Sequence, residues 1–235
     1  MTAPIELHYW ATPNGHKISI ALEEMGLPYD LHLVNIGKGE QFRPEFLAIA
    51  PNNRMPAIVD PEGPGGQPVS IFESGAILQY LGRKTGQFYG ADDRARIAVE
   101  QWLMWQMGGL GPMMGQANHF LKYAPQMDPP EVLPYAQNRY RTEVARLLKV
   151  LDGQLAKGDY VAGAYSIADM AIFPWARIAE KQEQDLAPFP ALRDWLARVG
   201  ERPAVVRGLE VGAAARSDAP MDKAQQEILF GKRPA

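Results

Sequence analysis

The stretch "NNRMPAIVDPEGPGGQPVSIFESGAI", residues 52–77, decides how the first third of the chain is expected to fold. "AIVD" and "PVSIF" are typical of two short strands, and the Gly/Pro-rich segment between them is typical of a turn that joins a hairpin. Pro56 has no N–H, so at the head of a strand it marks an edge or a special turn. Glu73 and Ser74 end the hairpin and open a helix, where serine is a common N-cap. The stretch therefore predicts two strands followed directly by a helix.

The residues around this hairpin alternate between strand and helix patterns. Asn14 is the expected N-cap of the first helix, Gly26 ends it, and Pro28 follows. The predicted order is strand, helix, strand, helix, strand, strand, helix, over residues 5–10, 14–26, 29–36, 43–50, 57–60, 68–72 and 73–86. This order predicts a compact unit with a small sheet and helices packed on it.

After about Gln87 the strand patterns stop and apolar residues recur at helical spacing. The segment "GGLGP", residues 108–112, predicts a kink or break in a long helical pattern. We therefore expect an α/β domain over 4–87, an all-helical domain over 92–210 and a tail over 211–235. The small polar residues of the tail favour a mobile segment over an ordered cap on a cleft.

Composition and charge exclude several classes of function. The chain has 235 residues, a formal net charge of −3 and no long basic run, which disfavours nucleic-acid binding and attraction to anionic membranes. No secretory apolar region and no stretch of membrane-spanning length is present, so we expect a cytoplasmic protein. The chain contains no cysteine, which excludes disulfides, thiolate metal sites and a protein thiol nucleophile.

Three short pieces of the first unit carry candidate chemistry. A helix start at Ser74 offers N–H groups to a carboxylate, and Glu73 beside it can bind an ammonium, although a plain cap next to a surface acid explains both residues as well. A cis Met55–Pro56 bond would turn the Met55 backbone outward to pair with an extended peptide, whereas base rates favour trans. Short polar residues in "TPNGHK", residues 12–17, can stabilise an anion such as a thiolate, or simply form a tight turn. Together the pieces match the cysteinyl backbone, the γ-glutamyl head and the thiol of glutathione.

Several further residues are candidates for a site. Tyr9 carries a hydroxyl, but its place within a strand favours packing. His16 and His119 are candidate general bases, yet no Asp or Glu spacing around them indicates a triad or a metal set, so no metal is expected. Six aromatic and methionine residues recur at helical spacing, and most are expected to pack in the core: Trp102, Met104, Trp105, Met107, Met113 and Met114. Of these, Met113 and Met114 are the better candidates for the walls of a pocket.

With these motifs, residues 4–210 resemble the glutathione transferase superfamily, which has a thioredoxin-like N-terminal domain and an all-α C-terminal domain. "MPAIVD" and "FESGAI" resemble its glutathione-site signature, and "YSIADMAIF", residues 165–173, resembles its helical capping motif. Ser166 and Asp169 then belong to folding, because serine caps the helix and the acid returns the bond at N3. "TPNGHKI", "GKGEQFRPEFL" and "PYAQNRY" are similar to the bacterial nu class and its yeast-prion-like relatives.

The resemblance implies roles for individual residues. Thr12 and Asn14 are expected beside the sulfur, in place of the tyrosine or serine of conventional transferases. Five residues are expected to hold the peptide: Gln41 and Arg54 at the glycyl end, Met55 through its backbone, and Glu73 and Ser74 at the γ-glutamyl group. Arg139 matches a position expected to reach a glutathione carboxylate, across a dimer in one reading.

The resemblance also implies the activity, which is glutathione-dependent disulfide-bond reduction with one or two glutathione molecules, or glutathione disulfide, as cosubstrate. A chain without cysteine would run the exchange through the sulfur of bound glutathione, which requires a thiolate. The expected partners are small disulfides or electrophiles and a second copy of the chain in a homodimer. Two alternatives stay open at this point: a conventional transferase that conjugates electrophiles, and a non-catalytic interaction module.

Overall fold

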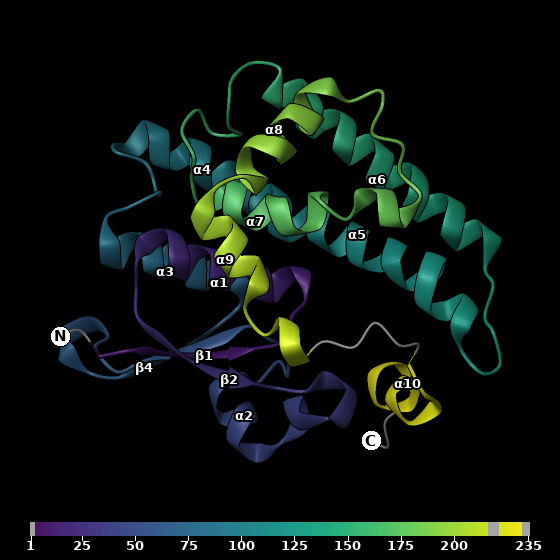
Figure 1. Cartoon of the computed structure of the whole chain (residues 1–235), viewed down its shortest axis with the longest axis horizontal. Coiled ribbons are helices and arrows are strands. Elements are labelled where there is room, and N and C mark those ends of the chain that lie inside the picture. The colour runs from purple at the N-terminus through teal and green to yellow at the C-terminus, as the bar shows by residue number, and fades with distance from the viewer. Residues whose placement is uncertain (1–2, 216–220, 232–235) are drawn as a thin grey trace. The chain divides into compact units, whose positions relative to one another are not determined.

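The computed structural model describes residues 3–215 and 221–231 (Figure 1). They form two compact units. The first comprises the chain up to Ile77 together with the segment from Arg207 onward, and the second comprises Leu78–Val206. The predicted tail, 211–235, lies partly outside the described residues, and its described part includes one helix, α10 (Lys223–Phe230).

A four-stranded mixed sheet forms the centre of the first unit, as expected for a thioredoxin-like domain. Its order is β2-β1-β3-β4, with β1 and β2 parallel and the other two pairs antiparallel. The predicted hairpin is confirmed, because β3 and β4 pair with Ala57 opposite Phe72. The strands span Ile5–Tyr9 (β1), Tyr29–Leu33 (β2), Ala57–Asp60 (β3) and Val69–Phe72 (β4).

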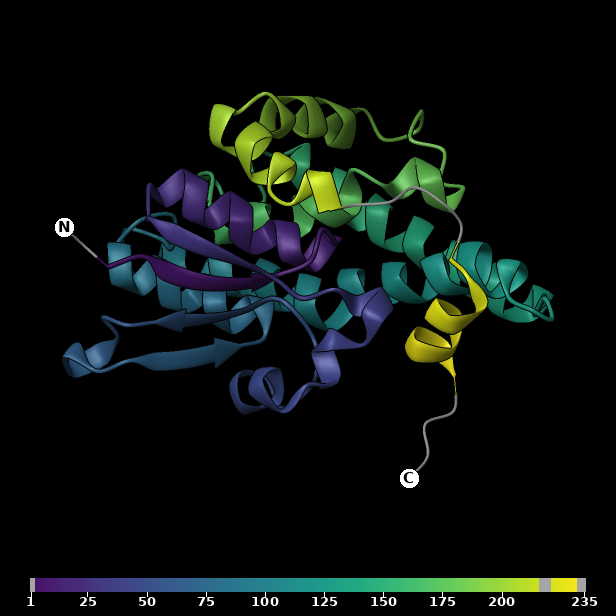
Figure 2. The same ribbon diagram turned by 60° about the horizontal axis from the view of Figure 1, so that its bottom comes forward.

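Helices α1 (Pro13–Met25) and α2 (Pro44–Ile49) lie on opposite sides of this sheet (Figures 1 and 2). The third helix, α3 (Ser74–Thr85), begins directly after β4, so the predicted order of strands and helices is confirmed. The expected N-cap of α1 is wrong: Thr12, not Asn14, caps the helix, because Pro13 occupies its first position. Three short 3₁₀ turns were not predicted: η1 (Ile36–Lys38), η2 (Glu40–Phe42) and η3 (Pro64–Gly66).

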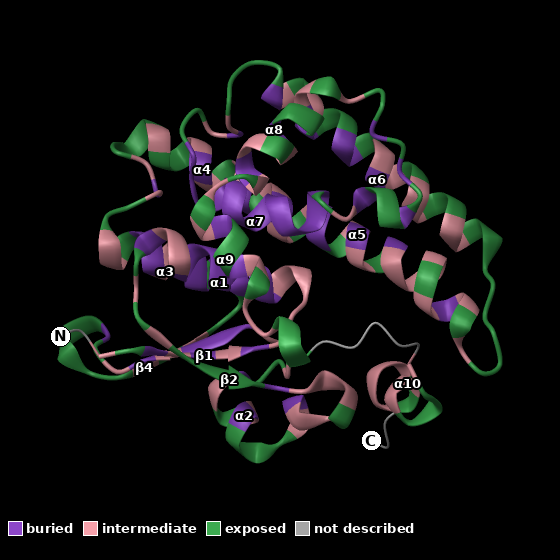
Figure 3. Ribbon diagram, viewed as in Figure 1, coloured by how far each residue is buried: buried purple, intermediate pink, exposed green. Residues whose placement is uncertain are grey.

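The core of the first unit lies where β1 meets α1. Leu7 and Tyr9 of β1 and Ile18 and Leu22 of α1 are fully buried (Figure 3). Burial alternates along β1, as in a strand with one fully buried face. In α1 every residue from Gly15 to Leu22 is buried, so α1 is a buried helix and not an amphipathic one.

Two described helices after residue 202, α9 (Pro203–Glu210) and α10, have contacts with this unit. Ser19 of α1 donates a 2.6 Å hydrogen bond to the carbonyl of Gly208 in α9. A Cβ atom on Gly208 would meet Cα of Ile20 at 2.7 Å, so only glycine permits this approach. Further along, α10 packs on η1, where Gln225 comes close to Gly37.

The second unit is helical, as predicted, and is built around α7 (Ile167–Ala176), which is buried along its whole length (Figure 3). Ser166 and Asp169 form the predicted capping box at the start of α7. Its other helices are α4 (Asp93–Trp105), α5 (Gly111–Asn118), α6 (Pro134–Leu155) and α8 (Pro190–Gly200), with short turns η6 (Ala124–Gln126) and η7 (Ala179–Gln182).

The predicted break at "GGLGP" takes the form of a π-helical turn, η4 (Gln106–Leu110), which joins α4 to α5 without leaving the helical backbone. A second π-helical turn, η5 (His119–Tyr123), follows α5. Pro112 sits in the first turn of α5, where its missing N–H is tolerated. The glycines therefore widen the helix locally and do not end it.

Candidate functional site

The sheet register brings three of the predicted pieces to one end of the sheet. β1 ends at Tyr9, shortly before Thr12. β3 starts at the same end of the sheet because His8 pairs with Ala57, and β4 finishes there because Phe72 also pairs with Ala57. The TPNG turn thus follows β1, and the Met55–Pro56 bond precedes β3. The Glu73-Ser74 pair follows β4. The antiparallel pairing of β3 with both neighbours produces this gathering.

Thr12 caps α1 with its side chain. Its Oγ1 accepts a 3.3 Å hydrogen bond from the N–H of Gly15 and donates a long, 3.4 Å bond to the carbonyl of Trp10. The donated bond is near the limit for an O–H···O interaction, so the hydroxyl hydrogen can turn to a stronger acceptor at little cost. A Cβ atom on Gly15 would lie 2.3 Å from the oxygen of Trp10, so glycine allows the helix start to approach the strand end.

Tyr9 does not face the solvent beside this turn. It is fully buried, and its hydroxyl lies 2.9 Å from Nδ1 of His16 and donates a 3.1 Å bond to the carbonyl of Val211. Since its hydrogen goes to the carbonyl, the imidazole of His16 is the donor in the first contact. Burial raises the pKa of Tyr9 to about 12. These contacts confirm the packing role predicted for Tyr9.

Glu73 turns the chain from β4 into α3. Its φ is +70°, a left-handed conformation, and its carbonyl accepts the first helical bond from the N–H of Ile77 at 2.9 Å. Its exposed carboxylate accepts a 3.3 Å bond from Nδ2 of Asn52. Ser74 beside it is buried at the first position of the helix. The pair therefore presents a carboxylate and a helix-start hydroxyl side by side.

Lys17 was not predicted from the sequence to lie beside Ser74. It is 1% exposed, and its Nζ lies 3.3 Å from Oγ of Ser74. Burial lowers the pKa of Lys17 to about 7, against the opposing effect of the Glu73 charge. The signal was present in the spacing, because Lys17, Ala21 and Met25 share one face of α1 and the latter two are buried.

The Met55–Pro56 peptide bond is cis, which is the rarer of the two alternatives. Within the described residues, the Met55 backbone takes part in no backbone–backbone hydrogen bond. Its side chain packs on the cluster of Val34, Phe46, Ala50 and Ala57. Arg54 is exposed beside it. The backbone N–H and C=O of Met55 are thus the kind of groups that an extended peptide would pair with.

Gln41 lies in η2 and is 4% exposed. Its Nε2 donates a 3.3 Å bond to the carbonyl of Ile36, and its Oε1 is buried with no partner among the described residues. A buried acceptor without a donor is costly. An amide N–H of a bound peptide would satisfy it, and the second hydrogen on Nε2 is the group suited to a carboxylate.

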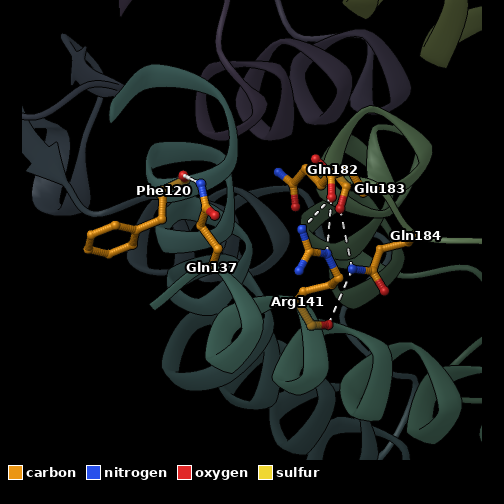
Figure 4. Close-up of polar contacts among 6 residues, drawn as sticks. All are labelled: Phe120, Gln137, Arg141, Gln182, Glu183 and Gln184. Atoms are coloured by element: carbon orange, nitrogen blue, oxygen red, sulfur yellow. Dashed lines mark hydrogen bonds and ion pairs between the residues drawn. The ribbon is translucent and has the colours of Figure 1, made fainter. Parts of the chain in front are cut away.

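Arg139 lies in the other unit, on α6, and is exposed. Its charge acts on Glu143 one turn along, where the hydrogen bond from Arg146 is the main cause of the lowered pKa of that carboxyl. Two residues along, Arg141 is already engaged, because its Nε donates to Glu183 at 3.0 Å (Figure 4). The structure thus places Arg139 on a different unit from the other predicted site residues.

The polar residues around Arg141 serve the helical backbone. Gln137 donates to the carbonyl of Phe120 within the π-helical turn η5 at 3.0 Å, and Gln184 donates to the carbonyls of Arg141 and Gln182, both at 3.3 Å (Figure 4). These amides satisfy carbonyl groups of the helices. The cluster is therefore structural.

The remaining candidates differ in burial. Met114 is fully buried, so its expected role as a pocket wall is wrong, while Met104 is exposed. His119 begins η5, and burial lowers its pKa. Among residues 3–215 and 221–231, no group of three or more His, Cys, Asp or Glu side chains is arranged to hold a metal ion. In the same residues, no helix has the length and apolar character needed to cross a membrane.

Comparison with known proteins places the chain in a family. Residues 11–84 match the model of the glutathione S-transferase N-terminal domain, and residues 117–203 match that of the C-terminal domain. The chain is 51% identical over 207 residues to the disulfide-bond oxidoreductase YfcG of Escherichia coli, an alignment that covers 87% of this chain and 94% of the relative.

Solved structures agree with the sequence comparison. A glutathione transferase from Pseudomonas putida, with one glutathione disulfide bound per subunit, has a TM-score of 0.84 and 46% identity, covering 89% of this chain and 92% of the other. A glutathione transferase from Burkholderia graminis, with two glutathione molecules bound per subunit, has a TM-score of 0.84 and 45% identity, covering 89% and 88%. The chain belongs to the glutathione transferase family.

Proposed function

We propose that this glutathione transferase family member is a glutathione-dependent disulfide-bond oxidoreductase. It uses glutathione, as one or two molecules or as glutathione disulfide, and its reactive sulfur is that of the ligand. The absence of cysteine from the chain requires this, since thiol–disulfide exchange needs a thiolate. The similarity to a disulfide-bond oxidoreductase over most of both chains supports the same activity.

The observation that carries the proposal is the contrast between Tyr9 and Thr12. The tyrosine hydroxyl near the first helix is buried and bonded to His16 and Val211, so it is committed to the fold. The hydroxyl of Thr12, by contrast, makes one long donated bond at the start of α1. An anion at this position would meet a hydroxyl and the positive end of the helix dipole. A thiolate stabilised in this way suits exchange with a disulfide.

The other predicted residues hold the peptide in this proposal. Glu73 binds the ammonium of the γ-glutamyl group, and Ser74 binds its carboxylate with a helix-start hydroxyl. Met55 pairs with the cysteinyl unit through its backbone. Gln41 and Arg54 bind the glycyl end.

Two further residues have roles that rest on the family resemblance alone. Asn14, in the first turn of α1, assists Thr12 at the sulfur. Arg139, on the helical unit, is assigned to a glutathione carboxylate.

The chemistry is two exchanges in sequence. The glutathione thiolate attacks one sulfur of the disulfide, forms a mixed disulfide, and releases the other sulfur as a thiolate that takes a proton. A second glutathione thiolate attacks the glutathione sulfur of the mixed disulfide, which yields glutathione disulfide and the second substrate thiol. Two glutathione molecules thus supply the two electrons that reduce one disulfide.

A side-by-side assay tests this function. We expect glutathione-dependent reduction of hydroxyethyl disulfide to be faster than conjugation of chlorodinitrobenzene at equal enzyme concentration. Faster conjugation would instead assign the chain to conventional transfer. No turnover with either substrate, together with no retention on a glutathione column, would assign it to a binding module.

We also propose a homodimer that acts in the cytoplasm on small disulfides, with domain bounds at 4–87 and 92–210. These assignments rest on the family resemblance. Sedimentation at micromolar concentration tests the first of them, and a monomer under these conditions would reject it.

A further inference from the structure

The side-chain amine of Lys17 lies next to the hydroxyl of Ser74, which the proposed function assigns to binding the γ-glutamyl carboxylate. Lys17 is 1% exposed, and its Nζ lies 3.3 Å from Oγ of Ser74. A neutral amine has a lone pair and can accept the hydrogen of a serine hydroxyl. An ammonium has donors only, so the serine oxygen must be the acceptor and its hydrogen must go to another group.

The protonation state of Lys17 therefore sets the direction of the hydrogen bond at Ser74. With the ammonium, the chain of donors runs from Nζ to Oγ and from Oγ to a ligand carboxylate. With the neutral amine, Ser74 can donate inward, toward Nζ, and a carboxylate then meets an oxygen lone pair. The ammonium also attracts the carboxylate through a weakly screened interior.

The groups around Lys17 determine its pKa and therefore the pH range in which it is charged. Burial lowers its pKa to about 7, and the Glu73 carboxylate at the start of α3 opposes this effect. On α1 itself the neighbouring His16 is turned to Tyr9 of β1, 2.9 Å from its hydroxyl. A bound carboxylate at Ser74 would add a second negative charge close to Nζ and favour the ammonium.

We propose that Lys17 is a positioning residue that takes up a proton when the γ-glutamyl carboxylate binds and thereby fixes the Ser74 hydroxyl as a donor to that carboxylate. This inference rests on the proposed function, which places the carboxylate at Ser74. It adds a proton to the binding equilibrium and makes the affinity for glutathione depend on pH.

The direction of this dependence follows from linkage. In the unbound protein Lys17 loses its proton as pH rises through about 7, whereas in the complex it holds the proton to higher pH. Binding therefore takes up a proton above pH 7, and the dissociation constant rises by up to about tenfold per pH unit there. Below pH 6, where both states hold the proton, the affinity is constant.

Calorimetry with S-methylglutathione measures this proton directly. The methyl group removes the thiol, whose ionisation on binding would release a proton and mask the uptake. Titrations in buffers of different ionisation enthalpy give the number of protons taken up. We expect about half a proton at pH 7, close to one at pH 8 and nearly none at pH 6. Binding with no proton uptake at any of the three pH values would overturn the inference.

A pair of variants assigns the proton to Lys17. Lys17→Met keeps an unbranched apolar stem and removes the amine, and we expect binding that is weaker, independent of pH and without proton uptake. Lys149→Met makes the same charge change at an exposed position of α6 and should behave as the wild type. Proton uptake that persists in Lys17→Met would overturn the assignment. If Lys17→Met fails to fold, the number of protons that the wild type takes up at pH 6, 7 and 8 tests the inference by itself.

The two proposals fail in different ways. If the proposed function is wrong, hydroxyethyl disulfide is not reduced faster than chlorodinitrobenzene is conjugated, whether or not S-methylglutathione binds. If only the inference about Lys17 is wrong, the ligand binds and the disulfide is reduced, but no proton accompanies binding.

Discussion

The starts of α1 and α7 each carry a hydroxyl cap, and the two caps differ in how completely they are enclosed. At the start of α7, Ser166 is buried and Asp169 accepts hydrogen bonds from the backbone N–H of Ser166 at 3.0 Å and of Val161 at 3.2 Å, and from Nε1 of Trp195 at 3.0 Å. At the start of α1, Thr12 is half-buried and makes bonds of 3.3 and 3.4 Å. The closed cap serves folding, and the open cap has capacity left for a ligand.

The start of α3 lies between these extremes. Ser74 is buried like Ser166, but the side chain beside it is the amine of Lys17, which in its charged form can only donate. At Ser166 the carboxylate of Asp169 accepts a hydrogen bond from the backbone N–H at the helix start. At Ser74 the charged amine of Lys17 would donate to the serine oxygen, so the serine hydrogen is directed to another acceptor. In this account, the acid beside Ser166 makes that helix start a folding motif, and the base beside Ser74 makes the other a binding motif.

The largest effect is expected from opening the closed cap. Asp169→Ala leaves the backbone N–H groups of Ser166 and Val161 and the indole of Trp195 without their acceptor, so we expect a loss of about 3 kcal/mol in the free energy of unfolding. Urea unfolding followed by circular dichroism measures it. Ser166→Ala, which removes one cap, should cost about 1 kcal/mol. A cost for Asp169→Ala no greater than that of Ser166→Ala would contradict the comparison.

The next effect is on ligand affinity. Glu73→Gln keeps the shape of a side chain in a left-handed backbone conformation and removes the charge that would pair with the ligand ammonium. We expect glutathione to bind about thirtyfold more weakly, which corresponds to about 2 kcal/mol, with little change in stability. Isothermal titration calorimetry measures the affinity. Glu45→Gln, an exposed acid on α2, is the matched control, and equal affinities in the two variants would remove Glu73 from the site.

A smaller effect is expected on turnover at the open cap. Thr12→Asp retains an N-cap oxygen but places a negative charge where the thiolate would form, which raises the thiol pKa and lowers the thiolate fraction. We expect kcat for hydroxyethyl disulfide to fall by about tenfold, or about 1.4 kcal/mol. Thr12→Ser keeps both functions of the hydroxyl and should retain most of the activity. If Thr12→Asp and Thr12→Ser turn over equally, Thr12 has no role at the sulfur.

The smallest expected effect is the pH dependence of stability without ligand. Lys17 has a pKa of about 7 in the folded chain and 10.5 in the unfolded chain, so the unfolded state binds more protons between these values. The free energy of unfolding should therefore rise by about 1 kcal/mol as pH increases from 7 to 8, and this rise should be smaller in Lys17→Met. Thermal melts across this range test the difference, and identical slopes in the two proteins would contradict the buried, deprotonating amine.

The alternation of strands and helices and the closed cap of α7 were predictable because each depends on local sequence. Period-two and period-3.6 patterns report which face is buried, and Ser166 and Asp169 stand at the spacing that a capping box requires. The cap of α1 is equally local, because a proline at the first helical position, Pro13, indicates Thr12 as the N-cap and not Asn14.

The site itself was only partly predictable because its contacts join distant segments. The approach of Lys17 to Ser74 depends on the packing of α1 beside the start of α3, 57 residues apart in sequence. The unpartnered Oε1 of Gln41 depends on the 3₁₀ turns that hold the loop after β2. The packing of α10 on η1 joins residues 223–230 to residues 36–38. No short pattern encodes such contacts.

A crystal structure grown with glutathione disulfide tests the central claim most directly, namely that the first unit holds a γ-linked peptide so that the peptide's own sulfur reacts. We predict one γ-glutamyl carboxylate within hydrogen-bond distance of the Ser74 hydroxyl, its ammonium on Glu73, the cysteinyl backbone paired with Met55 and the disulfide next to Thr12. Density for the ligand elsewhere, with solvent in contact with Ser74 and Thr12, would contradict the account.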